Sequence, residues 1–257
     1  MNIALLGYGK MGRAIAELAP ARGHRIAVAV DSDAEWEARG GEVARADVAI
    51  EFSTPATAVA NIRRCIGAGV PVVAGTTGWH DQLSALADEC RQAGGALFVA
   101  TNFSIGMNIV FEMNRRLAHI MNRHKEYAVS IEETHHVHKL DAPSGTAITL
   151  ARDIEAQRDD KSGWQLVGET FWQPGADAPE VRHSEMPSAA RVHIQSVRRG
   201  EVAGVHTIAY DGPADIIRLS HEAKGRQGLA LGALLAAEFL QGKRGYFTMS
   251  HLLAFDE

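Results

Sequence analysis

The chain has 257 residues, a formal net charge of −5, 46% hydrophobic residues and 6% aromatic residues, the composition of an ordinary soluble globular protein. It carries no basic stripe that would indicate nucleic acid as a partner, and no apolar run of the roughly 18 residues that a membrane helix needs. A chain of this length can bury two hydrophobic cores, so we expect two domains.

The two cysteines, Cys65 and Cys90, lie apart in segments with helical patterns. Neither belongs to the Cys-x-x-Cys spacing of a zinc site or to a disulfide framework. The N-terminus runs directly into an apolar segment without the charged start of a signal peptide. We therefore expect the protein to work in the reducing cytoplasm.

A glycine-rich turn opens the chain. The apolar run at 2–6 is followed at once by Gly7-Tyr-Gly-Lys-Met-Gly12 and then by a helical pattern at 13–18. In this strand–turn–helix context the glycines allow a tight turn and close approach of the backbone to a pyrophosphate. A second strand at 25–30 ends in Asp31, where an acidic residue accepts hydrogen bonds from an adenosine ribose. These features favour a dinucleotide site over a glycine-rich turn without function.

Three more strands continue the alternation of strand and helix, at 47–50, 70–74 and 96–99. Thr54 and Pro55 have the residue types of an N-cap and a first helical position. Polar and glycine residues at 75–78 and 100–106 follow two of these strands, so they would share the carboxyl edge of one parallel sheet, where such sheets bind ligands. Ordinary turn chemistry is the alternative for either segment alone.

The organisation changes after Gly106. The pattern predicts a helix at 109–120, a strand at 127–131, and a long ordered excursion, polar and rich in proline and glycine, at about 158–188. Alternating segments at 191–198, 204–210 and 215–221, joined by short turns, predict an antiparallel sheet. An apolar helix is expected at 228–240.

The densest chemistry lies in the loop between the strand at 127–131 and a helix that starts near residue 145. If Ser144 is the N-cap of that helix, the N–H groups of Gly145 and Thr146 point at a ligand, and the helix dipole favours an anion there. Lys139 and three histidines would crowd positive charge around the same point, which lowers their pKa values. These histidines are His135, His136 and His138. We therefore predict an anion site, with a histidine-rich surface loop or a structural zinc site as the weaker alternatives.

The segment Glu133-Thr-His-His-Val-His-Lys-Leu-Asp-Ala-Pro-Ser-Gly-Thr146 resembles the signature of the dihydrodipicolinate reductase family. The other segments that resemble this family, in the same order, are the turn at 7–12, Gly75-Thr-Thr-Gly78, Asn102-Phe-Ser-Ile-Gly106 and Ser220-His-Glu-Ala-Lys-Gly-Arg226. The resemblance covers nearly the whole chain.

This resemblance implies an α/β protein with two domains. A Rossmann-type dinucleotide-binding domain with a parallel sheet would span 1–104 and be rejoined by a C-terminal helix within 227–257. An α+β domain at 105–226, with a mixed or antiparallel sheet, would bind the substrate and build a homotetramer. The implied activity is the NAD(P)H-dependent reduction of 4-hydroxy-tetrahydrodipicolinate, with loss of water, in lysine biosynthesis.

The resemblance also implies residue roles. His135 would be the active-site histidine and Lys139 the proton donor, without a metal. The residues expected to hold the substrate's carboxylates are His136, Ser144, Gly145 and Thr146. The residues expected to hold the cofactor are Gly7, Tyr8, Gly9, Lys10, Met11, Gly12, Asp31, Gly75, Thr76, Thr77, Ala100, Thr101, Asn102, Phe103 and Arg226.

The chain departs from the family pattern in three places. The glycine turn is one residue shorter than the common form, Val137 replaces a basic residue, and Ser32 follows Asp31 where many members have an arginine. Because Asp31 repels a 2′-phosphate and Ser32 brings no cation, we expect NADH to be favoured, or both cofactors to be used. Another Rossmann imino-acid reductase and a non-catalytic dinucleotide sensor are the alternative functions.

Overall fold

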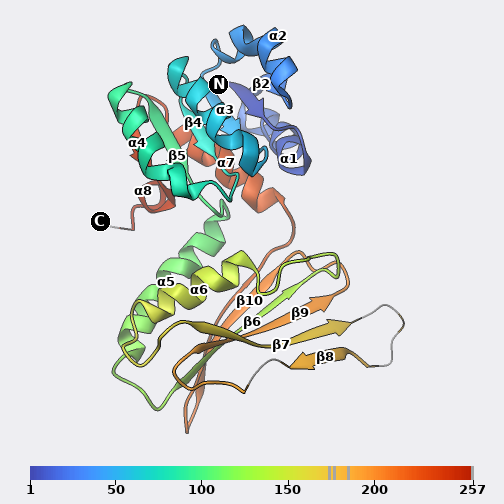
Figure 1. Ribbon diagram of the computed structural model, residues 1–257, viewed down its shortest axis with the longest axis vertical. Coiled ribbons are helices and arrows are strands. Elements are labelled where there is room, and N and C mark those ends of the chain that lie inside the picture. The colour runs from blue at the N-terminus through green and yellow to red at the C-terminus, as the bar shows by residue number, and fades with distance from the viewer. Residues whose placement is uncertain (173–174, 176–177, 184–185, 256–257) are drawn as a thin grey trace. The chain divides into compact units, whose positions relative to one another are not determined.

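The computed structural model describes residues 1–172, 175, 178–183 and 186–255. The chain divides into two compact units (Figure 1). One unit comprises Met1–Ile105 and Arg226–Glu257, and the other comprises Gly106–Gly225. In the described part of the chain, no helix is long and apolar enough to cross a membrane.

The first unit is built on a parallel sheet, as predicted. Its strands are β1 (Asn2–Leu6), β2 (Arg25–Val30), β3 (Val48–Glu51), β4 (Val72–Ala74), β5 (Ala96–Val99) and β12 (Gly245–Phe247). They lie in the order β12-β5-β4-β3-β1-β2, and every neighbouring pair is parallel. Apart from Asn2, Arg25 and Glu51 at strand ends, these strands carry apolar residues, because both faces of the sheet are covered.

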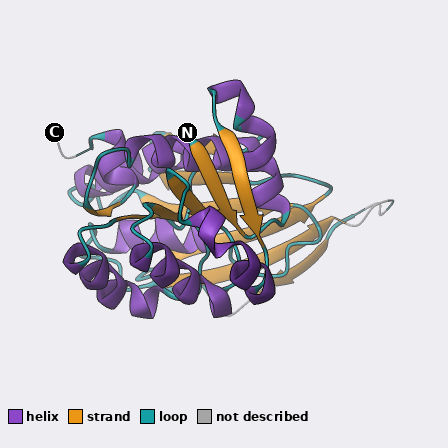
Figure 2. Cartoon of the chain, turned by 90° about the horizontal axis from the view of Figure 1, so that it is seen from above, coloured by secondary structure: helices purple, strands orange, loops and turns teal. Residues whose placement is uncertain are grey.

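Helices lie on both sides of this sheet (Figures 1 and 2) and form two hydrophobic cores with it. The helices are α1 (Lys10–Leu18), α2 (Asp33–Val43), α3 (Pro55–Gly67), α4 (Leu83–Gln92), α7 (Gln227–Phe239) and α8 (Met249–Leu253), with short 3₁₀ turns η1 (Pro20–Arg22) and η2 (His80–Gln82). Alternate residues of β1 divide between the cores. Ile3 and Leu5 pack with α1 and α7, whereas Ala4 and Leu6 pack with α3 and α4.

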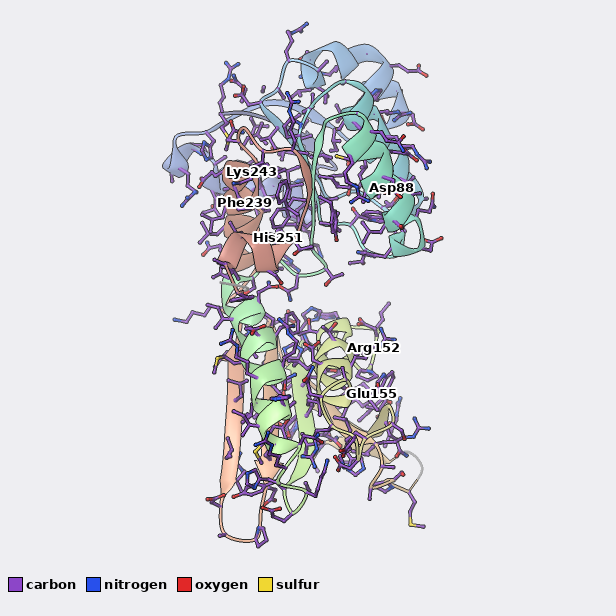
Figure 3. The ribbon with its side chains drawn as sticks, turned by 90° about the vertical axis from the view of Figure 1, so that its left-hand side faces the viewer. Asp88, Arg152, Glu155, Phe239, Lys243 and His251 are labelled. Carbon is purple, nitrogen blue, oxygen red and sulfur yellow. The ribbon has the colours of Figure 1, made fainter. Side chains whose placement is uncertain are left out.

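The C-terminal segment is more than the single helix that we expected. Helix α7 ends at Phe239, and the chain then turns, adds β12 beside β5 and forms α8. Gly242 in this turn and Gly245 at the start of β12 have φ values of 70° and 113°, which favour glycine. Figure 3 shows Phe239, Lys243 and His251 gathered in this segment, and Lys243 Nζ lies 4.5 Å from the centre of the Phe239 ring.

The second unit is a mixed sheet with two helices on one face. Its elements are α5 (Ile105–Met121), β6 (Ala128–His135), α6 (Gly145–Glu155), β7 (Trp164–Trp172), β8 (Glu180–His183), β9 (Val192–Arg199), β10 (Val205–Asp211) and β11 (Ile216–Glu222). The order is β11-β10-β6-β9-β7-β8, with β6–β9 and β9–β7 parallel and the other pairs antiparallel. Phe111 of α5 and Leu150 of α6 pack on Ile131 and Ile208 of the sheet.

One prediction for this unit was wrong in part, and another left two strands unassigned. The segments at 191–198 and 204–210 are strands, but β6 lies between them, so only β10 and β11 pair directly as an antiparallel hairpin. The alternation of apolar and polar residues and the turn residues predict where the chain reverses. They do not predict whether a strand from elsewhere in the chain lies between two successive strands. The excursion at 158–188 contains β7 and β8. Gly168 is the one fully buried position in β7, so the period-2 signal there is weak. Residues 173–174, 176–177 and 184–185 of the excursion lie outside the described part.

Candidate functional site

The carboxyl ends of four strands in the first unit are aligned at one edge of the parallel sheet. Leu6 pairs with Glu51, Glu51 with Ala74, and Ala74 with Val99. The segments that follow, which begin with Gly7, Phe52, Gly75 and Ala100, therefore leave the sheet side by side. The structure thus brings three of the predicted cofactor segments to the edge where open α/β sheets bind ligands.

The glycine turn has the geometry of a dinucleotide cradle. Gly7 has a φ of 97°, and a Cβ there would lie 2.0 Å from the carbonyl oxygen of Phe52. A Cβ on Gly12 would lie 2.3 Å from the carbonyl oxygen of Gly7. At Gly9 a Cβ would meet nothing within 4 Å. Two glycines are therefore required by packing, and the middle one leaves open space at the N-terminus of α1, which has no side-chain cap. These residues fit a pyrophosphate.

Asp31 lies directly beside this turn, as the ribose hypothesis requires. Its carboxylate accepts a hydrogen bond from the N–H of Tyr8 at 2.9 Å. A second acid, Glu35, accepts from the N–H of Asp31 at 2.6 Å, and Ser32 caps α2 by accepting from the N–H of Glu35. The corner between β2 and α2 therefore carries two carboxylates joined through the backbone of Asp31, and a third, Asp33, that pairs with Arg64 at 2.8 Å. Glu35 was not among the predicted site residues, although Ser32 and Glu35 have the spacing of a capping box.

Some predicted cofactor residues turn their side chains wholly or partly towards the interior. Phe103 is 2% exposed, and its ring packs against Phe52 and Phe98. The hydroxyl of Thr76 accepts from the N–H of Ser53 at 2.8 Å, so it faces the interior. Met11 packs against the core. The remaining side-chain positions are open to solvent to different degrees: Tyr8, Lys10, Thr77, Thr101 and Arg226 are exposed, and Asn102 is half-buried.

Glu51, which sequence analysis did not single out, ties two of these segments together. One of its carboxylate oxygens accepts from the N–H of Ser53 at 2.9 Å and from the hydroxyl of Thr76 at 3.0 Å. Burial raises the pKa of Glu51, and these hydrogen bonds oppose the shift. An acid at the end of an otherwise apolar buried strand was the available signal.

In the second unit, β6 and α6 hold the candidate substrate site. Ser144 is the N-cap of α6, as predicted, and its Oγ accepts from the N–H of Ala147 at 3.2 Å. Gly145 has nothing within 4 Å of the position of a Cβ, and it is exposed. Thr146 follows it in the first turn. The N-terminus of α6 is therefore open to an anion at Gly145.

His135 ends β6 and is oriented by a buried carboxylate. Its Nδ1 donates to Glu133, whose other oxygen accepts from Arg198 at 2.9 Å and from the N–H of Ser144 at 3.2 Å. Burial raises the pKa of Glu133, but the hydrogen bonds from His135 and Arg198 outweigh it and lower the pKa to about 2. Glu133 is therefore a carboxylate at neutral pH. With Nδ1 bound to it, the Nε2 of His135 is the atom left for a ligand.

The other charged side chains of the loop do not all gather around one point, contrary to our expectation. The side chain of His138 is 70% exposed and bonds Glu201 at 3.0 Å, so it does not join His135. His136 is half-buried, and burial lowers its pKa; the charge of Glu201 opposes this shift, and the charge of His138 adds to it. The ammonium of Lys139 lies 2.8 Å from Asp141, an opposite charge that the sequence analysis did not consider.

His206 of β10 is a second histidine in this site. Its Nε2 lies 3.0 Å from the Oγ of Ser144, and its ring meets that of His135 edge to face, with centroids 5.1 Å apart. Burial, followed by the charge of His135, lowers the pKa of His206 to about 3. His206 is therefore neutral at physiological pH.

Among the described residues, Glu133, His135 and His206 offer ligand atoms that all lie within 4.8 Å of one another. A metal ion would have to compete with Arg198, whose guanidinium already neutralises Glu133. The donor set is thus better matched to hydrogen bonding than to a cation.

Arg198 and His206 were not among the predicted site residues, although the strand pattern carries a signal for both. Val192, Ile194 and Arg198 lie on the buried face of β9, and His206 shares the inward face of β10 with Ile208. A charged or polar side chain at an inward position needs a buried partner. The alternation alone could therefore have placed both residues inside.

Comparison with known proteins covers the chain from end to end. Residues 1–103 match the family model of the dihydrodipicolinate reductase N-terminus, and residues 106–253 match that of the dihydrodipicolinate reductase C-terminus. The 4-hydroxy-tetrahydrodipicolinate reductase of Christiangramia forsetii is 44% identical over 255 residues, which cover 99% of this chain and 98% of that protein. The enzyme of the same name from Archaeoglobus fulgidus is 32% identical, with 98% and 100% covered.

Solved structures agree at the level of fold. Dipicolinate-bound dihydrodipicolinate reductase from Paenisporosarcina sp. TG-14 has a TM-score of 0.74 at 21% identity, covering 96% of this chain and 97% of that one. An amine dehydrogenase from Mycobacterium smegmatis has a TM-score of 0.56 at 12% identity, covering 96% and 94%. With both family models and a full-length relative matched, the chain belongs to the dihydrodipicolinate reductase family.

Proposed function

We propose that this chain catalyses the NAD(P)H-dependent reduction of 4-hydroxy-tetrahydrodipicolinate, with loss of water, to tetrahydrodipicolinate, a step of lysine and diaminopimelate biosynthesis. Family membership supports the reaction. The observation that carries the proposal is the open N-terminus of α6 at Gly145, beside a histidine that a buried carboxylate orients. A dicarboxylate substrate needs such an anion site next to a polar group that can act on its ring.

The substrate's carboxylates are proposed to bind at α6. The N–H groups of Gly145 and Thr146 and the hydroxyls of Ser144 and Thr146 would donate to one carboxylate, and His136 would contact the substrate from the preceding loop. The helix dipole and the nearby Lys139 favour negative charge at this point.

When bound, the cofactor supplies the hydride. Lys139 is proposed to donate a proton to the carbanion-like carbon that hydride addition leaves in the substrate, so its ammonium becomes a neutral amine. His135, held by Glu133, would orient the substrate through its Nε2. The carboxylate of Asp141 lies 2.8 Å from the ammonium of Lys139 and restrains its position.

The cofactor would bind at the carboxyl edge of the parallel sheet, on the glycine turn and the segments that begin at Gly75 and Ala100. We propose that NADH is used at least as well as NADPH. Asp31 accepts readily from ribose hydroxyls, and Glu35 places a second carboxylate beside it. A 2′-phosphate would face both charges. Lys10 and Arg13 are the nearby cations that would reduce this preference.

We further propose that the chain forms a homotetramer through its mixed sheet and works in the cytoplasm. Ser130 and Glu132 lie on the central strand β6 and are exposed, because α5 and α6 cover only the other face. A central strand with an open face is suited to contact with another subunit. Cys65 and Cys90 are buried free thiols, which fits a reducing compartment.

Oxidation of NADH with freshly generated 4-hydroxy-tetrahydrodipicolinate tests the reaction. We expect turnover that pyridine-2,6-dicarboxylate inhibits. Turnover with a simple imino acid in preference to the dicarboxylate would identify a different imino-acid reductase. Tight NADH binding without turnover of either compound would identify a dinucleotide sensor.

A further inference from the structure

The hydroxyl of Ser144 has more neighbours than a helix cap requires. Its Oγ lies 3.2 Å from the N–H of Ala147 and 3.0 Å from the Nε2 of His206. A serine hydroxyl has one hydrogen to donate and two lone pairs to accept with. One lone pair accepts from the N–H of Ala147. Whether the hydroxyl can donate its hydrogen to a ligand therefore depends on which ring nitrogen of His206 carries the proton.

His206 is buried and 4% exposed, and its Nδ1 has no hydrogen-bond partner among the described residues. Because the ring is neutral, it carries its single proton on either Nδ1 or Nε2. The two tautomers have opposite consequences for Ser144.

With the proton on Nδ1, a buried N–H is left without an acceptor, and the Ser144 hydroxyl must turn its hydrogen towards His206. With the proton on Nε2, His206 donates to Ser144, and Ala147 fills the other lone pair. The hydroxyl hydrogen is then free for the carboxylate that would lie at the N-terminus of α6. The buried Nδ1 is then an unpaired acceptor, and unpaired acceptors are tolerated better than unpaired donors.

We infer that His206 is a positioning residue for substrate binding: when a dicarboxylate is bound, His206 carries its proton on Nε2, donates it to Ser144 Oγ, and so directs the serine hydroxyl at a substrate carboxylate. This inference rests on the proposed substrate site at α6. It assigns His206 no contact with the substrate, because its effect passes through Ser144.

Nitrogen-15 NMR of the histidine-labelled protein reads the tautomer directly. We expect the His206 resonances, assigned by their loss in His206→Gln, to report a protonated Nε2 in the complex with pyridine-2,6-dicarboxylate. A protonated Nδ1 in that complex overturns the inference and leaves the proposed function intact. Wild-type protein that does not bind the dicarboxylate at all overturns the proposed site and this inference with it.

Two substitutions test whether the N–H donor of His206 or the volume of its ring is responsible for the effect on substrate binding. His206→Gln keeps an N–H donor at the distance of Nε2, whereas His206→Met keeps the length without a donor. We expect the Kd for pyridine-2,6-dicarboxylate to stay within about threefold of wild type in the first and to rise about tenfold or more in the second. The KM of the substrate should follow the Kd with kcat little changed, and the NADH Kd should not move.

The Ser144→Ala background completes the test. Without the hydroxyl, His206→Met should cause no further loss of dicarboxylate affinity. Two results would show that His206 acts through packing alone. One is an equal loss of dicarboxylate affinity in His206→Gln and His206→Met, and the other is a loss caused by His206→Met that is just as large in the Ser144→Ala background. The NMR assignment needs only one of the two variants to fold, since loss of the His206 resonances can be read in either His206→Gln or His206→Met, and the tautomer then decides the matter.

Discussion

Glu133 and Arg198 place opposite charges inside the second unit, on side chains that are 0% and 1% exposed. Removing either charge from water is costly, so the pair persists only because further hydrogen bonds satisfy both groups. Arg198 also donates to the carbonyl oxygen of Asp141 at 2.6 Å, and Glu133 also holds His135 and the N–H of Ser144. The pair therefore fixes both ends of the loop that carries Lys139.

The first prediction concerns Lys139. Lys139→Ala should lower kcat by about 10²–10⁴ with little change in the KM for NADH, because a positioned general acid is lost. Steady-state kinetics with circular dichroism as a folding control measure this. A severalfold, salt-sensitive loss would describe a solvated loop cation instead. Turnover close to wild type would transfer the acid role to His135 or to water.

The second prediction is an acid sensitivity caused by His206. Its folded-state pKa of about 3 is below the unfolded value of 6.5, so between these values the unfolded state binds the proton. Stability is therefore complete above pH 6.5 and decreases as the pH falls. From pH 7 to pH 5 the decrease should be about 2 kcal/mol.

Urea unfolding of wild type and His206→Gln at both pH values measures this decrease. The variant has no titrating group at this position, so its stability should depend less on pH by about that amount. Glu133 does not contribute in this window, because the stability from its lowered pKa is lost only below its usual 4.5. Equal pH dependence in both proteins would contradict the prediction.

At the scale of elements, the N-terminus of α6 supports a third prediction. Thr146→Val removes a hydroxyl donor from the first turn and should raise the Kd of pyridine-2,6-dicarboxylate by about tenfold, without changing the Kd of NADH. Thr149→Val is the matched control, because the Thr149 hydroxyl bonds the carbonyl oxygen of Gly145 within the helix. Calorimetry that finds NADH binding lost and dicarboxylate binding unchanged would reverse the roles proposed for the two units.

The corner between β2 and α2 supports a fourth prediction. Wild type should use NADH at least as well as NADPH, and Glu35→Gln should raise the NADPH-to-NADH ratio of kcat/KM severalfold, because one of two carboxylates is removed. Glu37→Gln makes the same charge change at an exposed position of the same helix and should leave the ratio unchanged. A tenfold preference of wild type for NADPH would refute the ribose argument.

At the scale of the whole molecule, the open face of the mixed sheet leads to a fifth prediction. Light scattering should give a mass four times that of the 27.7 kDa chain. Ser130→Arg adds a charge to the exposed face of β6 and should reduce the assembly, whereas Met113→Arg, on the exposed side of α5, should not. If the mass of the wild-type protein in solution equals that of a single chain, the proposed tetramer is wrong.

The sequence by itself determined the features that depend on neighbours along the chain. The apolar runs of β1 and β3 specified buried parallel strands, and the glycine turn specified the entry to α1. Ser144 as an N-cap and Asp31 beside the turn also followed from local spacing. Each depends on backbone geometry or periodicity that a few consecutive residues establish.

Only the tertiary structure decided which distant residues meet. It inserted β6 between β9 and β10, added β12 to the edge of the parallel sheet, and found β7 and β8 in a segment without clear periodicity. It also brought Arg198 to Glu133 and His206 to Ser144, across separations of 65 and 62 residues. Strand pairing and buried charge compensation arise from packing between segments, whereas local patterns specify only which side chains must turn inward.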